Sequence, residues 1–277
     1  MDITKPNGKI YKKRYIGHKQ NKSPVDSLNN TISPTLNSLV NQNNFYNPIE
    51  CFFNKNLFLF IKITNQVLRY MMWLNPAKSM NKKHVGYLII ILFIAGYFRF
   101  VGVNWDQNQH LHPDERFLTM VATGITWPAT FKDYLDTKTS SLNPHNKGFD
   151  FYVYGTWPVI FVKWVAEQVN MGSYDGVTIV GRVVSGIIEL LTVVLVFIIA
   201  LLLSKKTNVG LVASGIYACM ILPIQLAHFF AVDPYLTFFL TFSFYVLLKK
   251  SNGMLLGFVF GLAISAKISA LLFFPIV

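Results

Sequence analysis

The stretch from residue 181 to residue 206, "GRVVSGIIELLTVVLVFIIALLLSKK", decides the class of fold. Its apolar run is long enough to cross the hydrocarbon core of a bilayer as a helix, which takes roughly 20 residues. The whole chain agrees, because 52% of its 277 residues are hydrophobic and only 14% are charged, with a mean hydropathy of +0.39. Soluble domains carry about 25% charged residues. The sequence therefore predicts an all-α membrane protein.

Further apolar segments predict a polytopic bundle. Pairs of lysines end several of these segments, and basic residues gather on the cytoplasmic side of membrane proteins. Three pairs face the cytoplasm together if the chain has five spans and the first runs outward: Lys82/Lys83, Lys205/Lys206 and Lys249/Lys250. The net charge of +12 thus sets topology and does not indicate nucleic-acid binding. The expected spans are residues 84–103, 183–203, 209–230, 235–248 and 254 to the end, with residues 104–182 forming a long outer loop.

The beginning of the chain differs from the rest. Residues 1–50 are rich in Asn, Lys, Ser and Pro without apolar periodicity, which predicts disorder. Residues 51–74 are apolar but interrupted by polar side chains, which favours a helix at the membrane interface. The sequence at Met80 is typical of a protein start. We therefore expect residues 1–79 to be an extension from a misassigned start, and residues 80–277 to be a membrane domain that is incomplete at its C-terminus.

The outer loop contains one more apolar segment, residues 151–169, "FYVYGTWPVIFVKWVAEQV". A sixth span there would move Lys205 and Lys206 to the outer side and break the agreement of the lysine pairs. Pro158 and Lys163, together with the tryptophans, are typical of a helix that lies along the membrane surface. We expect an interfacial helix.

Ionisable residues cluster directly after the first span, in "QHLHPDERFL" (109–118). Asp114 and Glu115 lie in this cluster, and Asp233 lies at the next outer turn, in "HFFAVDPYLTFF" (228–239). Charged groups beside hydrocarbon are costly, and they are a functional hypothesis by default. The alternative is that Asp114 only caps a helix, because acidic residues favour the first helical turn.

The same cluster raises the question of a metal. His110, His112 and Asp114 are each two residues apart, a spacing that suits ligands on an extended segment, whereas helical sites prefer four. Nothing in the sequence completes a set of four ligands. We therefore assign no firm metal site and leave a divalent cation open as a cofactor.

The order of these features resembles the GT-C membrane glycosyltransferases, and within them the superfamily of protein O-mannosyltransferases and aminoarabinose transferases, of glycosyltransferase family 39 type. The features are a first span, the Asp-Glu pair, a long outer loop, the stretch 181–206, the span entered at Asp233, and "LLGFVFGLAISAKISALLFFP" (255–275). The resemblance covers residues 84–277, the N-terminal half of such an enzyme. It implies a GT-C-like transmembrane bundle.

The resemblance also implies an activity. Enzymes of this superfamily transfer a sugar from a polyprenyl-phosphate donor to an acceptor protein, lipid or glycan on the non-cytoplasmic side, with inversion. The acceptor loses a proton as it attacks, so Asp114 would act as general base, with Glu115 orienting the acceptor. We expect the bacterial cytoplasmic membrane as the location, with the active site facing outward and membrane lipids as neighbours.

Two cations complete the implied site. Arg182 matches the arginine of the family's R-x-P-S stretch, although Val184 replaces the proline. It would either bind the donor phosphate or anchor its span at the interface. Lys267, deep in the last apolar run, would bind the same phosphate or pair with Asp233.

His112, Tyr154 and Trp157 are candidate contacts with substrate. The segment around Tyr154 and Trp157 would form either a stacking face for a sugar or an isoprene unit, or an anchor at the interface. Two other classes of function stay open. A secondary transporter would use Asp114, Asp233 and Lys267 as a relay, although the sequence shows no internal repeat. A non-catalytic membrane scaffold is the other.

Overall fold

The computed structural model describes residues 81–276, which belong to a compact unit beginning at Ala77. Within this range every regular element is helical and no strand occurs. The expectations for the extension 1–79 lie almost wholly outside the described residues.

Two helices are long and apolar enough to cross a membrane, α3 (Lys82–Phe100) and α7 (Tyr174–Ser204). A third span results if α8 (Thr207–Ala218) and α9 (Ile221–Ala227) are counted as one, and these two are bent by 58° at the break between them. The remaining apolar helices, α10 (Asp233–Leu248) and α11 (Gly253–Ala266), are shorter than 18 residues. The part of the chain from residue 81 to residue 276 is therefore all-helical, with two or three candidate spans.

Three of the predicted spans differ from the helices in their boundaries. The segment expected at 183–203 is helical from Tyr174, because Ser173 caps its N-terminus by accepting a hydrogen bond from Gly176 N. Helix α7 thus begins within the segment 104–182 that the sequence assigned to the outer loop. The segment 209–230 is broken into α8 and α9.

The third difference concerns the last apolar segment. Helix α11 ends at Ala266, and a 3₁₀ helix, η2 (Ile268–Phe273), follows. Lys267 lies between the two helices with its backbone extended. It is thus at the end of a helix and not deep within one, as the sequence had suggested.

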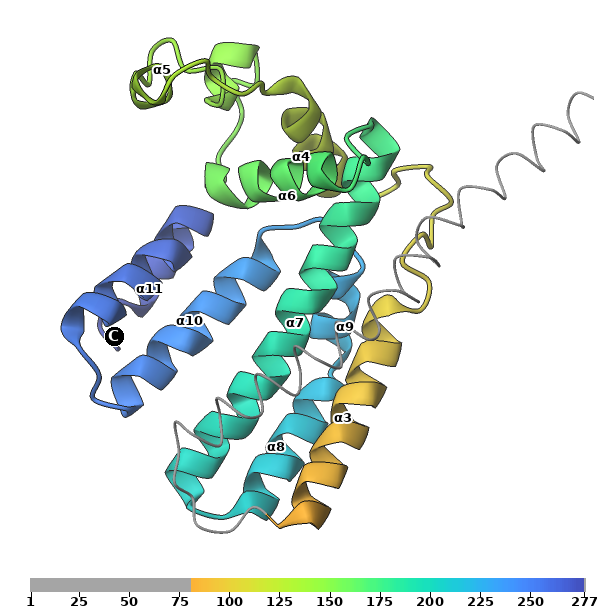
Figure 1. Cartoon of the computed structure of the whole chain (residues 1–277), viewed down its shortest axis with the longest axis vertical. Helices are drawn as coiled ribbons and strands as arrows, with labels where there is room; N and C mark the ends of the chain where they lie inside the picture. The colour runs from red at the N-terminus through yellow and green to blue at the C-terminus, as the bar shows by residue number, and fades with distance from the viewer. Residues whose placement is uncertain (1–80, 277) are drawn as a thin grey trace, which may run out of the picture. The chain divides into compact units, whose positions relative to one another are not determined.

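The arrangement of the helices agrees with the lysine pairs (Figure 1). The start of α3, the turn from α7 to α8 and the turn from α10 to α11 all lie toward one end of the bundle. The long connection between α3 and α7 lies at the opposite end. Helix α7 packs against α3, α8, α9 and α10, and it also contacts the helices of the long connection. Each lysine pair thus lies away from the acidic segments.

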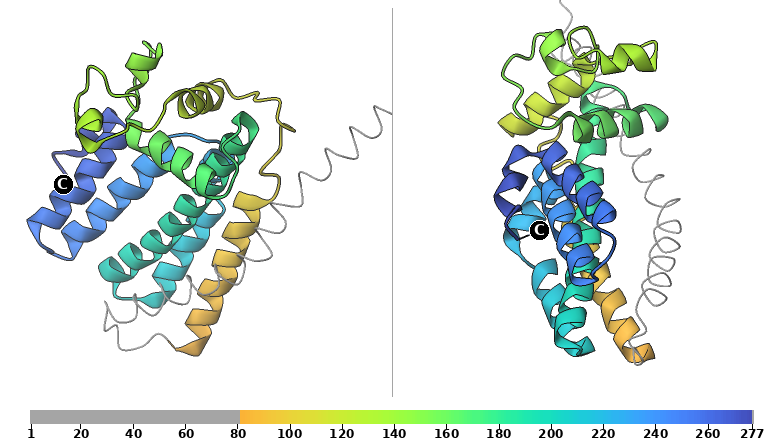
Figure 2. Two further views of the ribbon diagram at one scale, coloured as in Figure 1. Left: turned by 45° about the horizontal axis from the view of Figure 1, so that its top comes forward. Right: turned by 90° about the vertical axis from the view of Figure 1, so that its left-hand side faces the viewer.

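The long connection forms a cap built of α4 (Pro113–Gly124), α5 (Phe131–Leu135), η1 (Pro144–Lys147) and α6 (Thr156–Gln168). Helix α6 crosses the end of α7 instead of following its direction (Figures 1 and 2). The exposed aromatic residues Phe161 and Trp164 line one side of α6. This orientation agrees with a helix lying along a membrane surface.

A close backbone contact fastens the cap to the bundle. Gly155 N donates to Ala266 O at 2.9 Å, at the junction between the start of α6 and the end of α11. A Cβ atom on Gly155 would lie 1.6 Å from Ser265 O, so only glycine fits. The main core lies beneath this junction, where α4, α6, α7 and the start of α10 meet, and includes Leu118, Val162, Val180, Phe230 and Tyr235.

Candidate functional site

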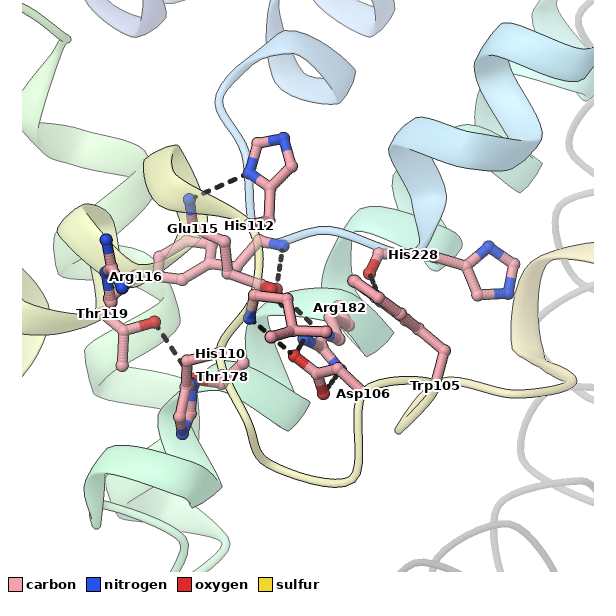
Figure 3. A network of polar contacts seen from close by, with 12 residues as sticks. Trp105, Asp106, His110, His112, Glu115, Arg116, Thr119, Thr178, Arg182 and His228 are labelled. Atoms are coloured by element: carbon pink, nitrogen blue, oxygen red, sulfur yellow. Dashed lines mark hydrogen bonds and ion pairs between the residues drawn. The ribbon is translucent and has the colours of Figure 1, made fainter.

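Arg182 lies at the centre of a buried ionic cluster (Figure 3). Its guanidinium donates to both carboxylate oxygens of Glu115, from Nε at 2.7 Å and from Nη2 at 2.6 Å. It also donates to both oxygens of Asp106, from Nη1 at 3.0 Å and from Nη2 at 2.8 Å. All three side chains have no exposed surface. We call Asp106, Glu115 and Arg182 the buried triad.

Backbone groups complete the hydrogen bonding of the buried triad. Phe230 N donates to Glu115 Oε1 at 2.8 Å, and Leu111 N donates to Asp106 Oδ2 at 3.3 Å. Val103 O accepts from Arg182 Nη1 at 2.9 Å. The triad therefore ties together four segments, the loop after α3, the start of α4, helix α7 and the loop before α10. A buried charged group needs this full set of hydrogen bonds, because burying an unpaired charge costs much free energy.

The loop after α3 is held in an unusual conformation by these contacts. Gln107, Asn108 and His110 have φ values of 52°, 63° and 50°, in the left-handed region. This region costs free energy for residues other than glycine and persists where the surroundings impose it. Two residues fix this loop against Arg182. Asp106 bonds the guanidinium, and the ring of Trp105 lies 5.5 Å from the guanidinium carbon.

The charge balance of the triad affects acid stability. Burial alone would raise the pKa of Asp106, but the hydrogen bonds and charge of Arg182 outweigh it and hold this pKa below its ordinary value. Two carboxylates face one guanidinium, so loss of Arg182 would remove the main interactions that oppose the effect of burial on the pKa of Asp106.

These positions correct two predicted roles. Glu115 was expected to orient an acceptor, but it is fully buried and bonded to Arg182 and Phe230. Arg182 was expected to bind a donor phosphate or anchor a span, but its side chain is also fully buried and forms ion pairs with Asp106 and Glu115. Sequence reasoning missed Asp106, because nothing in its surroundings distinguishes it from a polar loop residue.

A second cluster lies at the exposed surface of the same end. Lys267 Nζ contacts Asp233 Oδ1 at 2.7 Å, with the two side chains 32% and 38% exposed. This confirms one of the two expectations for Lys267, a pair with Asp233. Asp114 is exposed and has no hydrogen-bond or ion-pair partner among residues 81–276. Tyr154 lies near all three, and we call these four residues the exposed cluster.

Electrostatics link the members of the exposed cluster. Burial raises the pKa of Tyr154, the Asp114 and Asp233 carboxylates raise it further, and Lys267 opposes them. A tyrosine that senses all three charges must lie within their electrostatic range. Asp114, from the start of α4, and the pair at the ends of α10 and α11 therefore each lie within electrostatic range of Tyr154, although they are far apart in sequence.

Helix geometry explains why Asp114 is exposed while Glu115 is buried. Successive residues of a helix point about 100° apart, so an inward Glu115 turns Asp114 toward the outside. The helix cap is His112 and not Asp114, because His112 Nδ1 accepts from Glu115 N at 3.3 Å. Asp114 occupies the first turn, where a carboxylate interacts favourably with the helix dipole.

Two of the candidate substrate contacts also hold elements of the structure together. Besides capping α4, His112 stacks on Phe229 with ring centroids 4.2 Å apart. Trp157 Nε1 donates to Leu262 O at 3.1 Å, which adds a second bond between α6 and α11. Tyr154 is half-buried and faces the charges described above.

The predicted metal residues point apart. His110 bonds Asp175 through Nε2 at 2.8 Å and Thr178 through Nδ1 at 3.3 Å, whereas His112 caps α4. No group of three or more His, Cys, Asp or Glu side chains that could hold a metal occurs within the described range 81–276.

Comparison with known proteins adds no relative. No family model, no curated protein and no solved structure matches the chain. The case for a function rests on the two clusters and on their place at the end of the bundle opposite the lysine pairs.

Proposed function

We propose that this protein transfers a sugar from a polyprenyl-phosphate donor to an acceptor at the outer membrane surface, with Asp114 as the general base. The observation that carries the proposal is the exposed cluster, in which the unpaired Asp114 carboxylate and the Asp233–Lys267 pair lie at the same end of the helices, each within electrostatic range of Tyr154. A base and an anion-binding cation are the two groups that such a transfer needs.

The reaction divides between the two groups. The acceptor oxygen forms a bond to the anomeric carbon while the bond from that carbon to the phosphate oxygen breaks, and the acceptor proton passes to Asp114. Lys267 stabilises the negative charge that grows on the leaving phosphate. It is half-exposed and its partner Asp233 is on the surface, so a phosphate can replace that partner at low cost.

The resemblance to the family 39 type enzymes supports this reading for part of the site. It supplies the base role for Asp114 and the phosphate role for Lys267. The roles that it implied for Glu115 and Arg182 are not retained, because both side chains are enclosed in the buried triad. The location that fits the proposal is a bacterial cytoplasmic membrane, with the exposed cluster outside.

The test is sugar transfer by the full chain in proteoliposomes, with a panel of polyprenyl-phosphate sugars and of hydroxyl and amine acceptors. Asp114→Asn is expected to lower the rate by about 10²- to 10⁴-fold, the usual contribution of a general base. Asp150→Asn, which changes another exposed aspartate of the same cap, should keep the rate of the parent protein. A parent protein inactive with every donor, or an Asp114→Asn variant within a few-fold of it, would refute the proposal.

A secondary transporter is a second candidate, because the helix break between α8 and α9 lies near two buried ionisable residues, Arg99 and Glu189. Broken helices with such groups are typical of transporters. Transport predicts that an added solute dissipates a proton gradient across the proteoliposomes, and that Glu189→Gln prevents this. Glycosyl transfer predicts product without loss of the gradient.

A further inference from the structure

The break between α8 and α9 has a cause in the sequence. Pro223 has no N–H to donate to the carbonyl of Cys219, and its ring would clash with that carbonyl in a continuous helix. Helix α8 therefore ends at Ala218, and α9 starts at Ile221 after a bend of 58°. Carbonyls at such a break need other donors, because lipid supplies none.

Arg99 of α3 supplies these donors. Its Nη1 donates to Ala218 O at 3.0 Å and its Nη2 to Tyr217 O at 3.5 Å, with a further bond from Nη1 to Ala95 O at 3.2 Å in its own helix. The Arg99 side chain is completely buried. The guanidinium thus fastens the last carbonyls of α8 to the outer end of α3.

Glu189 of α7 holds the same break from the other side. Tyr217 donates its hydroxyl to Glu189 Oε2 at 2.9 Å, and Glu189 is 1% exposed. Tyr217 is therefore bound through its carbonyl to α3 and through its hydroxyl to α7. Arg99 and Glu189 attract each other electrostatically, but no ion pair joins them in the described part of the chain. The guanidinium instead turns toward the carbonyls of the break, as a capping group does.

The bend controls where the next segment lies. Helix α9 leads into the loop before α10, and both ring nitrogens of His228 there contact carbonyls, Ile224 O at 2.8 Å and Val101 O at 2.9 Å. Phe230 N then bonds Glu115 of the buried triad. Asp233 follows and pairs with Lys267 in the exposed cluster. A change in the bend would displace each of these contacts.

We propose that Arg99, Tyr217 and Glu189 form a positioning network that sets the bend between α8 and α9 and thereby places Asp233 against Lys267. Its importance for catalysis rests on the proposed function. The geometric claim does not, and it adds to the exposed cluster three positioning residues from the bundle itself.

Zero-length cross-linking with a carbodiimide measures this geometry without any activity. The reagent joins a carboxylate to a contacting amine, so it should link Asp233 to Lys267 in the full-length membrane-embedded protein. Lys163 and Glu167, which are 2.9 Å apart on α6, give an internal reference that does not depend on the bend. Peptide mass spectrometry then gives the ratio of the two cross-links.

Arg99→Met is expected to lower the ratio several-fold, and Arg99→Lys should restore part of it because an ammonium can still donate to the carbonyls. Tyr217→Phe, which keeps the carbonyl and loses the hydroxyl, should give a smaller loss. Glu189→Gln should stay near the parent value because the amide oxygen still accepts a hydrogen bond.

Parent ratios in both Arg99→Met and Tyr217→Phe would overturn the proposal. If Arg99→Met loses the reference cross-link as well, the variant has misfolded and Tyr217→Phe alone decides. A parent protein that transfers no sugar but shows these ratios would refute the proposed function and leave the positioning network standing.

Discussion

Asp114 and Glu115 are adjacent in the chain and have the same functional group, yet they belong to different parts of the molecule. Glu115 lies inside the buried triad with Asp106 and Arg182, without exposed surface. Asp114 lies in the exposed cluster with Tyr154 and the Asp233–Lys267 pair. One step along a helix, about 100° of rotation, separates the two environments.

The difference shows that burial determines whether a charged residue at this end of the bundle stabilises the fold or is free to contact a substrate. A buried charge needs every bond satisfied, so its partners are fixed and it stabilises one arrangement of segments. An exposed charge loses little when it changes partner, so it can meet a substrate. We therefore expect changes in the buried triad to act on stability and changes in the exposed cluster to act on function.

The largest effect on stability should come from Arg182→Met. The substitution leaves two buried carboxylates without a cation, and breaking a buried ion pair in this way costs about 3–5 kcal/mol. Unfolding of the protein in detergent micelles, followed by denaturant titration, measures the loss. Arg116→Met is the matched control, because Arg116 is exposed on α4 and should stay near the parent value. Equal midpoints for both variants would contradict a stabilising triad.

A smaller loss is expected for Gly155→Ala, which tests the junction between the cap and the bundle. The added Cβ would lie 1.6 Å from Ser265 O, so α6 must move away from α11, and overpacking of this kind costs about 1–3 kcal/mol. Gly261→Ala is the control, because Gly261 lies within α11 with open space around its Cβ position, and this variant should be at least as stable as the parent. A Gly155→Ala variant as stable as the parent would show that the close contact is not needed.

Acid should weaken the buried triad. Because the pKa of Asp106 is lower in the folded state than its ordinary value, its contribution is complete above the unfolded value of about 3.9. It is lost as the pH falls through the folded value. The free energy of unfolding should therefore fall with pH below about 4, and less steeply in Asp106→Asn. Identical slopes in the two proteins would exclude Asp106 as a source of acid sensitivity.

The smallest effect on stability is expected for Lys267→Met in the exposed cluster. Partly exposed ion pairs contribute about 0–1 kcal/mol, so the unfolding midpoint should move little. A loss as large as that of Arg182→Met would mean that the Asp233–Lys267 pair is part of the core and not of a site.

The sequence predicted those features that depend on local pattern. The helical class follows from the apolar segments. That Lys82, Lys205 and Lys249 lie at the same end of the bundle follows from the preference of basic residues for the cytoplasmic ends of such segments. The same topology placed Asp114 and Asp233 at one end, and the structure brings both near Tyr154.

Features that depend on long-range pairing could not be read from the sequence. Arg182 has its partners 67 and 76 positions away, so its burial was invisible and its position beside an apolar run suggested a helix end. The break after Ala218 had one signal, Pro223, which a hydropathy reading passes over because the flanking residues are apolar. The end of α11 before Lys267 was missed for the same reason, because apolar residues flank this lysine on both sides.

The most direct test measures Asp114→Asn and Glu115→Gln side by side, each for unfolding and for sugar transfer in proteoliposomes. The division between the two clusters predicts that Asp114→Asn unfolds within about 0.5 kcal/mol of the parent and loses transfer. Glu115→Gln should lose about 1–3 kcal/mol, because the amide nitrogen that replaces one carboxylate oxygen cannot accept the hydrogen bond from Arg182 Nη2, and should still transfer sugar in proportion to the folded protein. The reverse pattern, or two variants alike in both measurements, would contradict this account.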